Sequence, residues 1–148
     1  MFSQCRAHAI ELIVVIDPVH ALLLEGIRQR GDWGAYREWK SDLVELATSH
    51  GATVWDFTGY TEWTAEPLLG EEASRSQWFW EPSHMKRELG DKVLARVFGD
   101  TRAEPALGVR LTLDKLAEHW AITERDRREW LQTSVDDVRA LASLLARP

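Results

Sequence analysis

An unbroken run of aliphatic residues near the N-terminus constrains the fold most strongly. The run is Leu12-Ile13-Val14-Val15-Ile16, closed by Asp17-Pro18. Because it is apolar on both faces, it predicts a strand buried in a parallel sheet rather than a half-exposed antiparallel strand. A second segment, residues 52–57, also reads as a strand, and Thr58-Gly59-Tyr60 follows it as a loop signal.

The residues between these two strands have the spacing of helices. A short helix is expected around Leu22 to Ile27, and a longer one over residues 33–49, ended by His50-Gly51. Strand, helix and strand in this order predict a βαβ unit with a right-handed crossover. On the longer helix, Lys40 is expected to lie at the surface.

Both predicted strands end in an acid, Asp17 and Asp56. In open α/β sheets, ligands bind outside the carboxyl ends of the strands, so a site is expected at this edge, beneath a long loop over residues 58–80. Asp17 and the nearby His20 are candidate substrate-binding residues, although His20 also reads as a polar residue at a helix start. For Asp56 we expect a structural role, bonded to loop amides.

The segment WFWEPSH, residues 78–84, carries the clearest chemical signal. A carboxylate that accepts from one imidazole nitrogen leaves the other free as a general base for a hydroxyl, so Glu81 and His84 are candidate catalytic residues. The alternative is an ordinary entrance to a helix over residues 84–98, with Ser83 as its cap.

The chain has eight tryptophans, and two of them lie within this segment. Trp78 and Trp80 are candidate substrate-binding residues, because aromatic faces suit acyl chains and sugar rings. The alternative is that they anchor the loop on the core.

Together these pieces resemble the C-terminal half of the SGNH/GDSL hydrolases, whose last block is Asp-x-x-His ahead of the final helix. The matching pieces are LIVVIDPVH, TVWDF, and WEPSH followed by a helix ending in VLARVFG, between residues 10 and 99. The resemblance implies part of a flavodoxin-like three-layer α/β sandwich, with about two parallel strands flanked by helices. It also implies ester hydrolysis or acyl transfer on a small ester or acylated glycan, with His84 as general base, Glu81 orienting it, and no cofactor.

The sequence departs from that family in two respects. Glu81 stands where the family usually has Asp, and the Gly-Asp-Ser nucleophile block and the oxyanion Gly and Asn blocks are missing. We therefore expect the isolated chain to be inactive. It is a gene fragment, a chain whose partner supplies the missing strands, or a domain that has lost catalysis. The alternative function is a non-catalytic α/β interaction module, which binds a partner chain or itself through a Trp-rich, exposed sheet edge.

Beyond Gly99 the pattern changes. Residues 100–108 read as a linker, and helices are expected over 112–121, 123–132 and 134–146. We therefore divide the chain into an α/β portion, 1–99, and a helical appendage, 100–148, in which His119 belongs to no recognisable constellation.

Charge and composition exclude several classes of function. The net charge is -6 and basic residues are mixed with acids, which argues against a nucleic-acid partner. Cys5 is the sole cysteine, so no internal disulfide is possible, and the absence of a tight His pair argues against a metal site at Asp17, His20, Glu81 and His84. No apolar run reaches the ~20 residues of a membrane helix, and the N-terminus does not read as a signal peptide. The compartment stays unassigned, with the cytoplasm as default.

Overall fold

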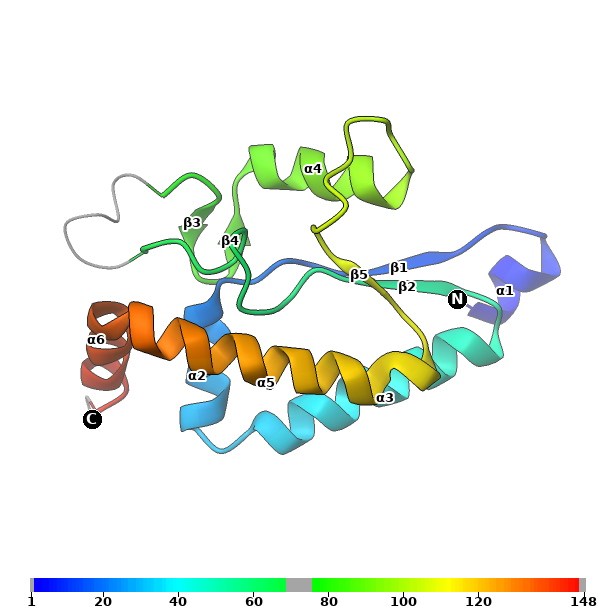
Figure 1. The fold of residues 1–148 in the computed structure, drawn as a ribbon. Helices are drawn as coiled ribbons and strands as arrows, with labels where there is room; N and C mark the ends of the chain where they lie inside the picture. The colour runs from blue at the N-terminus through cyan, green and yellow to red at the C-terminus, as the bar shows by residue number, and fades with distance from the viewer. Residues whose placement is uncertain (1, 69–75, 147–148) are drawn as a thin grey trace.

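The computed structural model describes residues 2–68 and 76–146, which form a mixed α/β fold (Figure 1). A small sheet lies between helices, and a separate two-stranded hairpin flanks it. In chain order the elements are α1 (Phe2–Ala7), β1 (Ile13–Ile16), α2 (Ala21–Gln29), α3 (Trp33–Ser49), β2 (Thr53–Asp56), β3 (Phe79–Glu81), β4 (His84–Met85), α4 (Arg87–Val97), β5 (Val109–Leu111), the 3-10 helix η2 (Leu113–Lys115), α5 (Leu116–Thr133) and α6 (Val135–Leu145).

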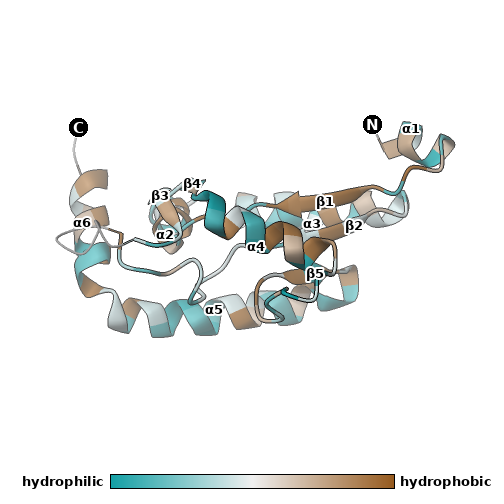
Figure 2. Cartoon of the chain, turned by 90° about the horizontal axis from the view of Figure 1, so that it is seen from above, coloured by the Kyte–Doolittle hydropathy of each residue, from teal (hydrophilic) through white to brown (hydrophobic). Residues whose placement is uncertain are grey.

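The predicted parallel pair is confirmed. β1 and β2 run parallel in the register Ile13 opposite Thr53 through Ile16 opposite Asp56, and α2 and α3 form the crossover between them. β1 is hydrophobic along its length (Figure 2), as its aliphatic sequence requires. Among the described residues it pairs with β2 alone, which makes it an edge strand of the three-stranded sheet.

The third strand of the sheet was not predicted. β5 (Val109–Leu111) pairs antiparallel with the other side of β2, and it lies between the expected linker, 100–108, and the expected helix, 112–121. Gly108 makes this approach possible. Its φ is +71°, and a Cβ there would lie 2.3 Å from Cε1 of the Phe57 ring, so a side chain would collide with Phe57.

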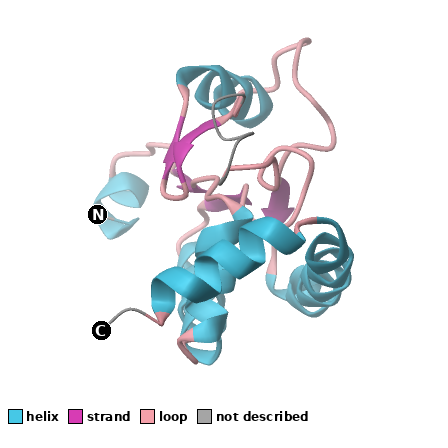
Figure 3. Cartoon of the chain, turned by 90° about the vertical axis from the view of Figure 1, so that its left-hand side faces the viewer, coloured by secondary structure: helices cyan, strands magenta, loops and turns pink. Residues whose placement is uncertain are grey.

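Helices lie on both sides of the strands. Figures 1 and 3 show α4 on one side and α2, α3 and α5 on the other. α3 packs Val44 and Ala47 against Val54 of β2 and Leu111 of β5, because residues three and four apart share one helix face. α4 begins at Arg87 rather than at His84 as expected, and it buries Leu89 and Val93.

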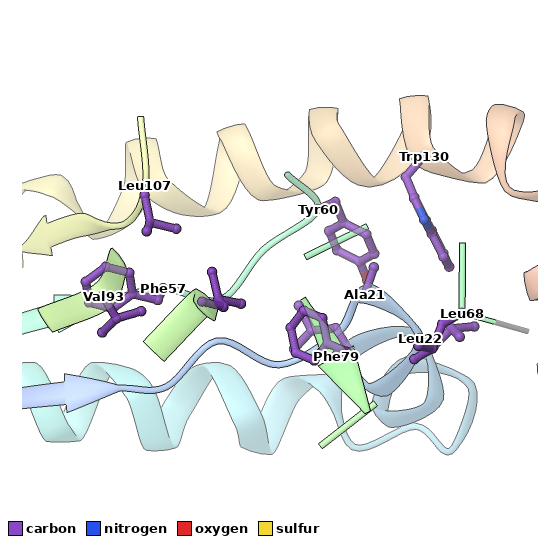
Figure 4. Close-up of a cluster of buried hydrophobic side chains, with 11 residues drawn as sticks. Ala21, Leu22, Phe57, Tyr60, Leu68, Phe79, Val93, Leu107 and Trp130 are labelled. Carbon is purple, nitrogen blue, oxygen red and sulfur yellow. The ribbon is translucent and has the colours of Figure 1, made fainter. Parts of the chain in front are cut away.

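The C-terminal segment belongs to the same core as the rest of the chain. Trp130 of α5 packs among Leu22 of α2, Tyr60 and Phe79 in one cluster of buried side chains (Figure 4). Together with β5, this contact joins residues 100–148, the expected helical appendage, to the sheet and core.

Two ion pairs fix α5 across α2. Arg127 donates two hydrogen bonds to the Glu25 carboxylate, at 2.7 and 2.8 Å, and Arg28 donates to Glu124 at 2.5 Å. Glu25 is almost fully buried, and a bidentate Arg–carboxylate pair fixes orientation as well as distance. The long helix α5 therefore holds a set position relative to α2. Within the described ranges, no helix has the length and apolar character to cross a membrane.

Candidate functional site

The β3–β4 hairpin brings the two predicted catalytic residues together. Glu81 lies directly opposite His84 in the antiparallel register, and Pro82 and Ser83 form the turn between them. Residues opposite each other on paired strands have neighbouring side chains, which is why a spacing of three produces a contact here. The predicted helix entrance at His84 is wrong, since a strand begins there.

The Glu81 carboxylate is held by its neighbours. Its Oε1 contacts His84 Nδ1, and Ser83 donates its hydroxyl to Oε1 at 2.6 Å and its backbone N–H to Oε2 at 3.1 Å. The hydrogen bonds from the Ser83 hydroxyl and N–H, and then the one from His84, lower the pKa of Glu81 to about 2. Ser83 thus braces the carboxylate and does not cap a helix as expected.

His84 presents its other ring nitrogen to solvent. Its side chain is 77% exposed and that of Glu81 is 48% exposed. Nε2 makes no hydrogen bond to any part of the chain that the structure describes. The ionised carboxylate favours a proton on Nδ1, which leaves a lone pair on Nε2. His84 is therefore oriented as a general base would be, with the lone pair of Nε2 pointing away from Glu81. Both side chains are exposed to water.

Glu66 fixes the start of the hairpin. Its Oε1 accepts hydrogen bonds from the backbone N–H groups of Trp78 at 2.7 Å and Phe79 at 2.9 Å, and its Oε2 accepts from Gln77 at 2.5 Å. The Ser76 hydroxyl donates to the same carboxylate at 2.6 Å. The Glu66 side chain therefore links the two parts of the predicted 58–80 loop that the structure describes. Residues 69–75 of that loop, which include Gly70, lie outside the described ranges.

His20 is buried and fully bonded. Its Nδ1 accepts from the backbone N–H of Leu22 at 3.2 Å and caps α2, while its Nε2 lies 2.7 Å from the Glu66 carbonyl oxygen. Burial lowers the pKa of His20, against smaller opposing effects from Glu66 and Asp137, so the neutral form is favoured. With both nitrogens occupied, His20 has no atom to offer a substrate. The helix-start interpretation is the correct one.

Asp17 is exposed at the end of β1. It lines an apolar pocket of about 270 Å³ with Val19, Leu23 and Trp39 among others, and the lining includes neither Glu81 nor His84. The structure therefore gives Asp17 a place at the carboxyl end of the parallel strands, as predicted from the sequence, but in a pocket separate from the carboxylate–histidine pair.

The two predicted tryptophans have different surroundings. Trp78 is half-buried and packs on Trp63, with ring centroids 5.2 Å apart. Trp80 is 74% exposed, and Lys86 Nζ lies 4.6 Å from its ring centroid. Trp78 therefore serves as an anchor of the loop, whereas Trp80 is an exposed ring next to Glu81 that also contacts Lys86.

A buried polar cluster at the end of β2 was missed by sequence reasoning. Lys40 Nζ of α3 donates to Asp56 Oδ2 at 2.6 Å and to the Thr58 hydroxyl at 2.8 Å. Asp56 Oδ1 accepts from the N–H and the hydroxyl of Thr58 at 2.9 and 2.8 Å, as expected for an acid bonded to its loop. His119 Nε2 of α5 lies 3.1 Å from Asp56 Oδ2.

The cluster keeps Asp56 charged in spite of its burial. Burial acts to raise the pKa of Asp56, but the neighbouring His119 and Lys40 outweigh it and lower that pKa to about 2. The Lys40 and Asp56 side chains are 1% and 0% exposed. This is a buried ion pair with an imidazole as third member.

Helical periodicity contained a signal for Lys40. Tyr36, Lys40, Val44 and Ala47 recur at spacings of four, four and three, so Lys40 lies on the buried face of α3. The prediction that Lys40 is a surface residue is wrong. It was based on the charge of the side chain and not on its place on the buried face of α3. His119 had no local signal, since its partner is distant in sequence.

Comparisons with models of protein families, with curated proteins and with solved structures found no match. Within residues 2–68 and 76–146, no group of three or more His, Cys, Asp and Glu side chains is placed to hold a metal ion.

Proposed function

We propose that Glu81 and His84 are the acid–base half of a serine-dependent hydrolase or acyltransferase site, acting on a small ester or an acylated glycan. The observation that supports this is the contact of Glu81 Oε1 with His84 Nδ1, which leaves Nε2 without a partner in the described chain. In this role Nε2 takes the proton of a serine hydroxyl and returns it to the leaving group, while Glu81 stabilises the imidazolium.

In this proposal the serine comes from outside the 148 residues, because they contain no Gly-Asp-Ser block. Ser83 is the nearest hydroxyl, but its Oγ donates to Glu81 and lies 3.2 Å from Nδ1 of His84. A nucleophile has to lose its proton to Nε2, on the opposite side of the ring. Ser83 is therefore a brace for the carboxylate, and the exposed Nε2 is the atom that an added serine would approach.

The free edge of β1 is the place where further strands would pair. Val15 on this strand is 36% exposed, although parallel strands are normally covered on both sides. Extra strands along β1 would complete a larger, flavodoxin-like sheet of the kind that the resemblance to SGNH hydrolases implies. They would come from a longer chain or from a partner.

A second candidate is a non-catalytic interaction module. It is favoured by the exposed aromatic faces of Trp39 and Trp80 and by the unpaired edge of β1. In that case the binding of a partner depends on Trp39 and β1, and loss of the His84 imidazole has no effect on it.

The two functions are separated by an esterase assay on chains of two lengths. The purified 148 residues should not turn over p-nitrophenyl acetate. A chain extended by the reading frame upstream of Met1, or by a partner with a Gly-Asp-Ser block, should do so. His84→Ala should abolish that turnover, while His8→Ala, which changes an exposed histidine elsewhere, should not. Absence of both a Gly-Asp-Ser block and any turnover would favour the interaction module.

A further inference from the structure

A cavity of about 220 Å³ opens beside the buried cluster, between the end of β2, the segment before β5, and α5. Phe57 and Leu107 form apolar walls, and His119 and Asp126 supply polar ones. Figure 4 shows Leu107 and Tyr60, another lining residue, beneath the helix that carries His119. The cavity thus combines an apolar wall with charged and polar groups at the carboxyl end of a strand, where α/β proteins bind ligands.

His119 differs from the structural histidine of this fold. Both ring nitrogens of His20 are bonded to the backbone. The His119 side chain is 10% exposed, and its Nε2 lies 3.1 Å from Asp56 Oδ2 without the alignment of a hydrogen bond. Nδ1 also makes no hydrogen bond within the residues that the structure describes. A nine-tenths buried imidazole at a cavity wall, with neither nitrogen hydrogen-bonded within the described residues, is the arrangement of a group that contacts a ligand.

The charges around the cavity define what it would accept. Lys40 balances Asp56, and Arg125 donates two hydrogen bonds to Oδ1 of Asp126, so the site has no net charge to attract an ion. The ionised Asp56 favours the proton on Nε2 of His119, which leaves Nδ1 as an acceptor. Oδ2 of Asp126 is a second acceptor, with no hydrogen bond in the described chain.

We propose that this cavity binds a small neutral polyol, with His119 Nδ1 and Asp126 Oδ2 each accepting a hydrogen bond from a hydroxyl group. The carbon skeleton packs against Phe57 and Leu107. The volume lies below the ~300–1,000 Å³ of pockets for drug-sized ligands, so the ligand is of monosaccharide size or smaller. This site shares no residue with Glu81 and His84 and does not depend on their proposed role.

The test is an NMR titration of the 148-residue chain with glycerol, myo-inositol and glucose, and separately with sodium phosphate and sodium acetate. We expect one polyol to shift the His119 imidazole signals with saturation. His119→Gln retains an N–H donor toward Asp56 but lacks the acceptor at Nδ1, so it should bind that polyol about fivefold more weakly, the loss of one hydrogen bond. Asp126→Asn should weaken binding similarly, and His8→Ala should leave it unchanged.

Three results would overturn the proposal. One is that none of the three polyols gives a saturable shift at His119 in the folded protein. Another is that phosphate or acetate binds there more tightly than any polyol. The third is that folded His119→Gln binds the polyol with the same affinity as the wild type, which would show that Nδ1 does not contribute to binding.

Discussion

Lys40 Nζ lies 2.6 Å from Asp56 Oδ2, and the two side chains are almost completely excluded from water. The pair links the buried face of α3 to the carboxyl end of β2. Thr58 bonds to both members, so every charged atom at the pair's centre has a partner. Such a pair is sensitive to the loss of one member, because the other is then left as an uncompensated buried charge.

Lys40→Met should therefore lower the free energy of unfolding by about 3–5 kcal/mol, the usual cost of breaking a buried ion pair. Urea denaturation at pH 7 measures this. The matched control is Lys92→Met, which removes a half-exposed pair with Glu104 and should cost about 0–1 kcal/mol. Lys40→Met combined with Asp56→Asn should be more stable than Lys40→Met alone. Equal decreases in the free energy of unfolding for Lys40→Met and Lys92→Met would contradict a stabilising role for the buried Lys40–Asp56 pair.

Stability should also depend on pH through Asp56. Its pKa is about 2 in the folded chain against an ordinary value of 3.8, so the folded state favours the ionised form. The resulting stabilisation is fully present above about pH 5 and is lost as the pH falls toward 2. Between pH 5 and pH 2, the free energy of unfolding of the wild-type protein should fall by about 2 kcal/mol more than that of Asp56→Asn, because of the shift in the pKa of Asp56.

Glu81→Gln provides the comparison for that experiment. The pKa of Glu81 is also about 2, but this carboxylate is exposed and its interactions are screened by water. Its pH profile of stability should follow that of the wild type. An Asp56→Asn profile parallel to the wild type from pH 5 to 2 would show that Asp56 does not carry the effect.

Gly108 should not tolerate a side chain. Gly108→Ala combines a positive φ with a collision with the Phe57 ring, whereas Gly99→Ala has φ +68° but open space around its Cβ. Gly99→Ala should cost about 1 kcal/mol, from backbone strain alone. Gly108→Ala should cost more than twice as much, and Phe57→Leu should recover part of the loss. Thermal unfolding of the variants measures this, and equal costs at the two glycines would argue against the close approach.

Sequence reasoning predicted the elements whose signal is local. β1 was found because its residues are all aliphatic and β-branched, and β2 because Thr, Val and Trp favour strands. β5 was missed because Val109–Leu111 is short, and its identity as a strand depends on pairing with the distant β2. The same reason explains why the C-terminal segment was expected as an appendage: the contact of Trp130 with Tyr60 exists only in three dimensions.

The candidate site was predictable to a similar extent. The Glu81–His84 pair was identified from its spacing, although through a helix entrance and not the hairpin that brings it together. Lys40 was misplaced even though its position on α3 indicated burial. His119 and Asp56 are 63 positions apart, so no pattern along the chain connects them. The pairing of polar groups that are distant in sequence is the part of this site that only the structure could reveal.

The most direct test of the proposed acid–base role is to label the serine that His84 would activate. The chain, purified from its native cells with whatever it associates with, is treated with a fluorophosphonate, which reacts with activated serines. We expect one serine outside the 148 residues, on a longer form of the chain or on a partner, to be labelled. The label should be lost in His84→Ala and should be as strong in His8→Ala as in the wild type. A preparation in which no serine is labelled, or in which His84→Ala is labelled equally, would contradict the role proposed for His84.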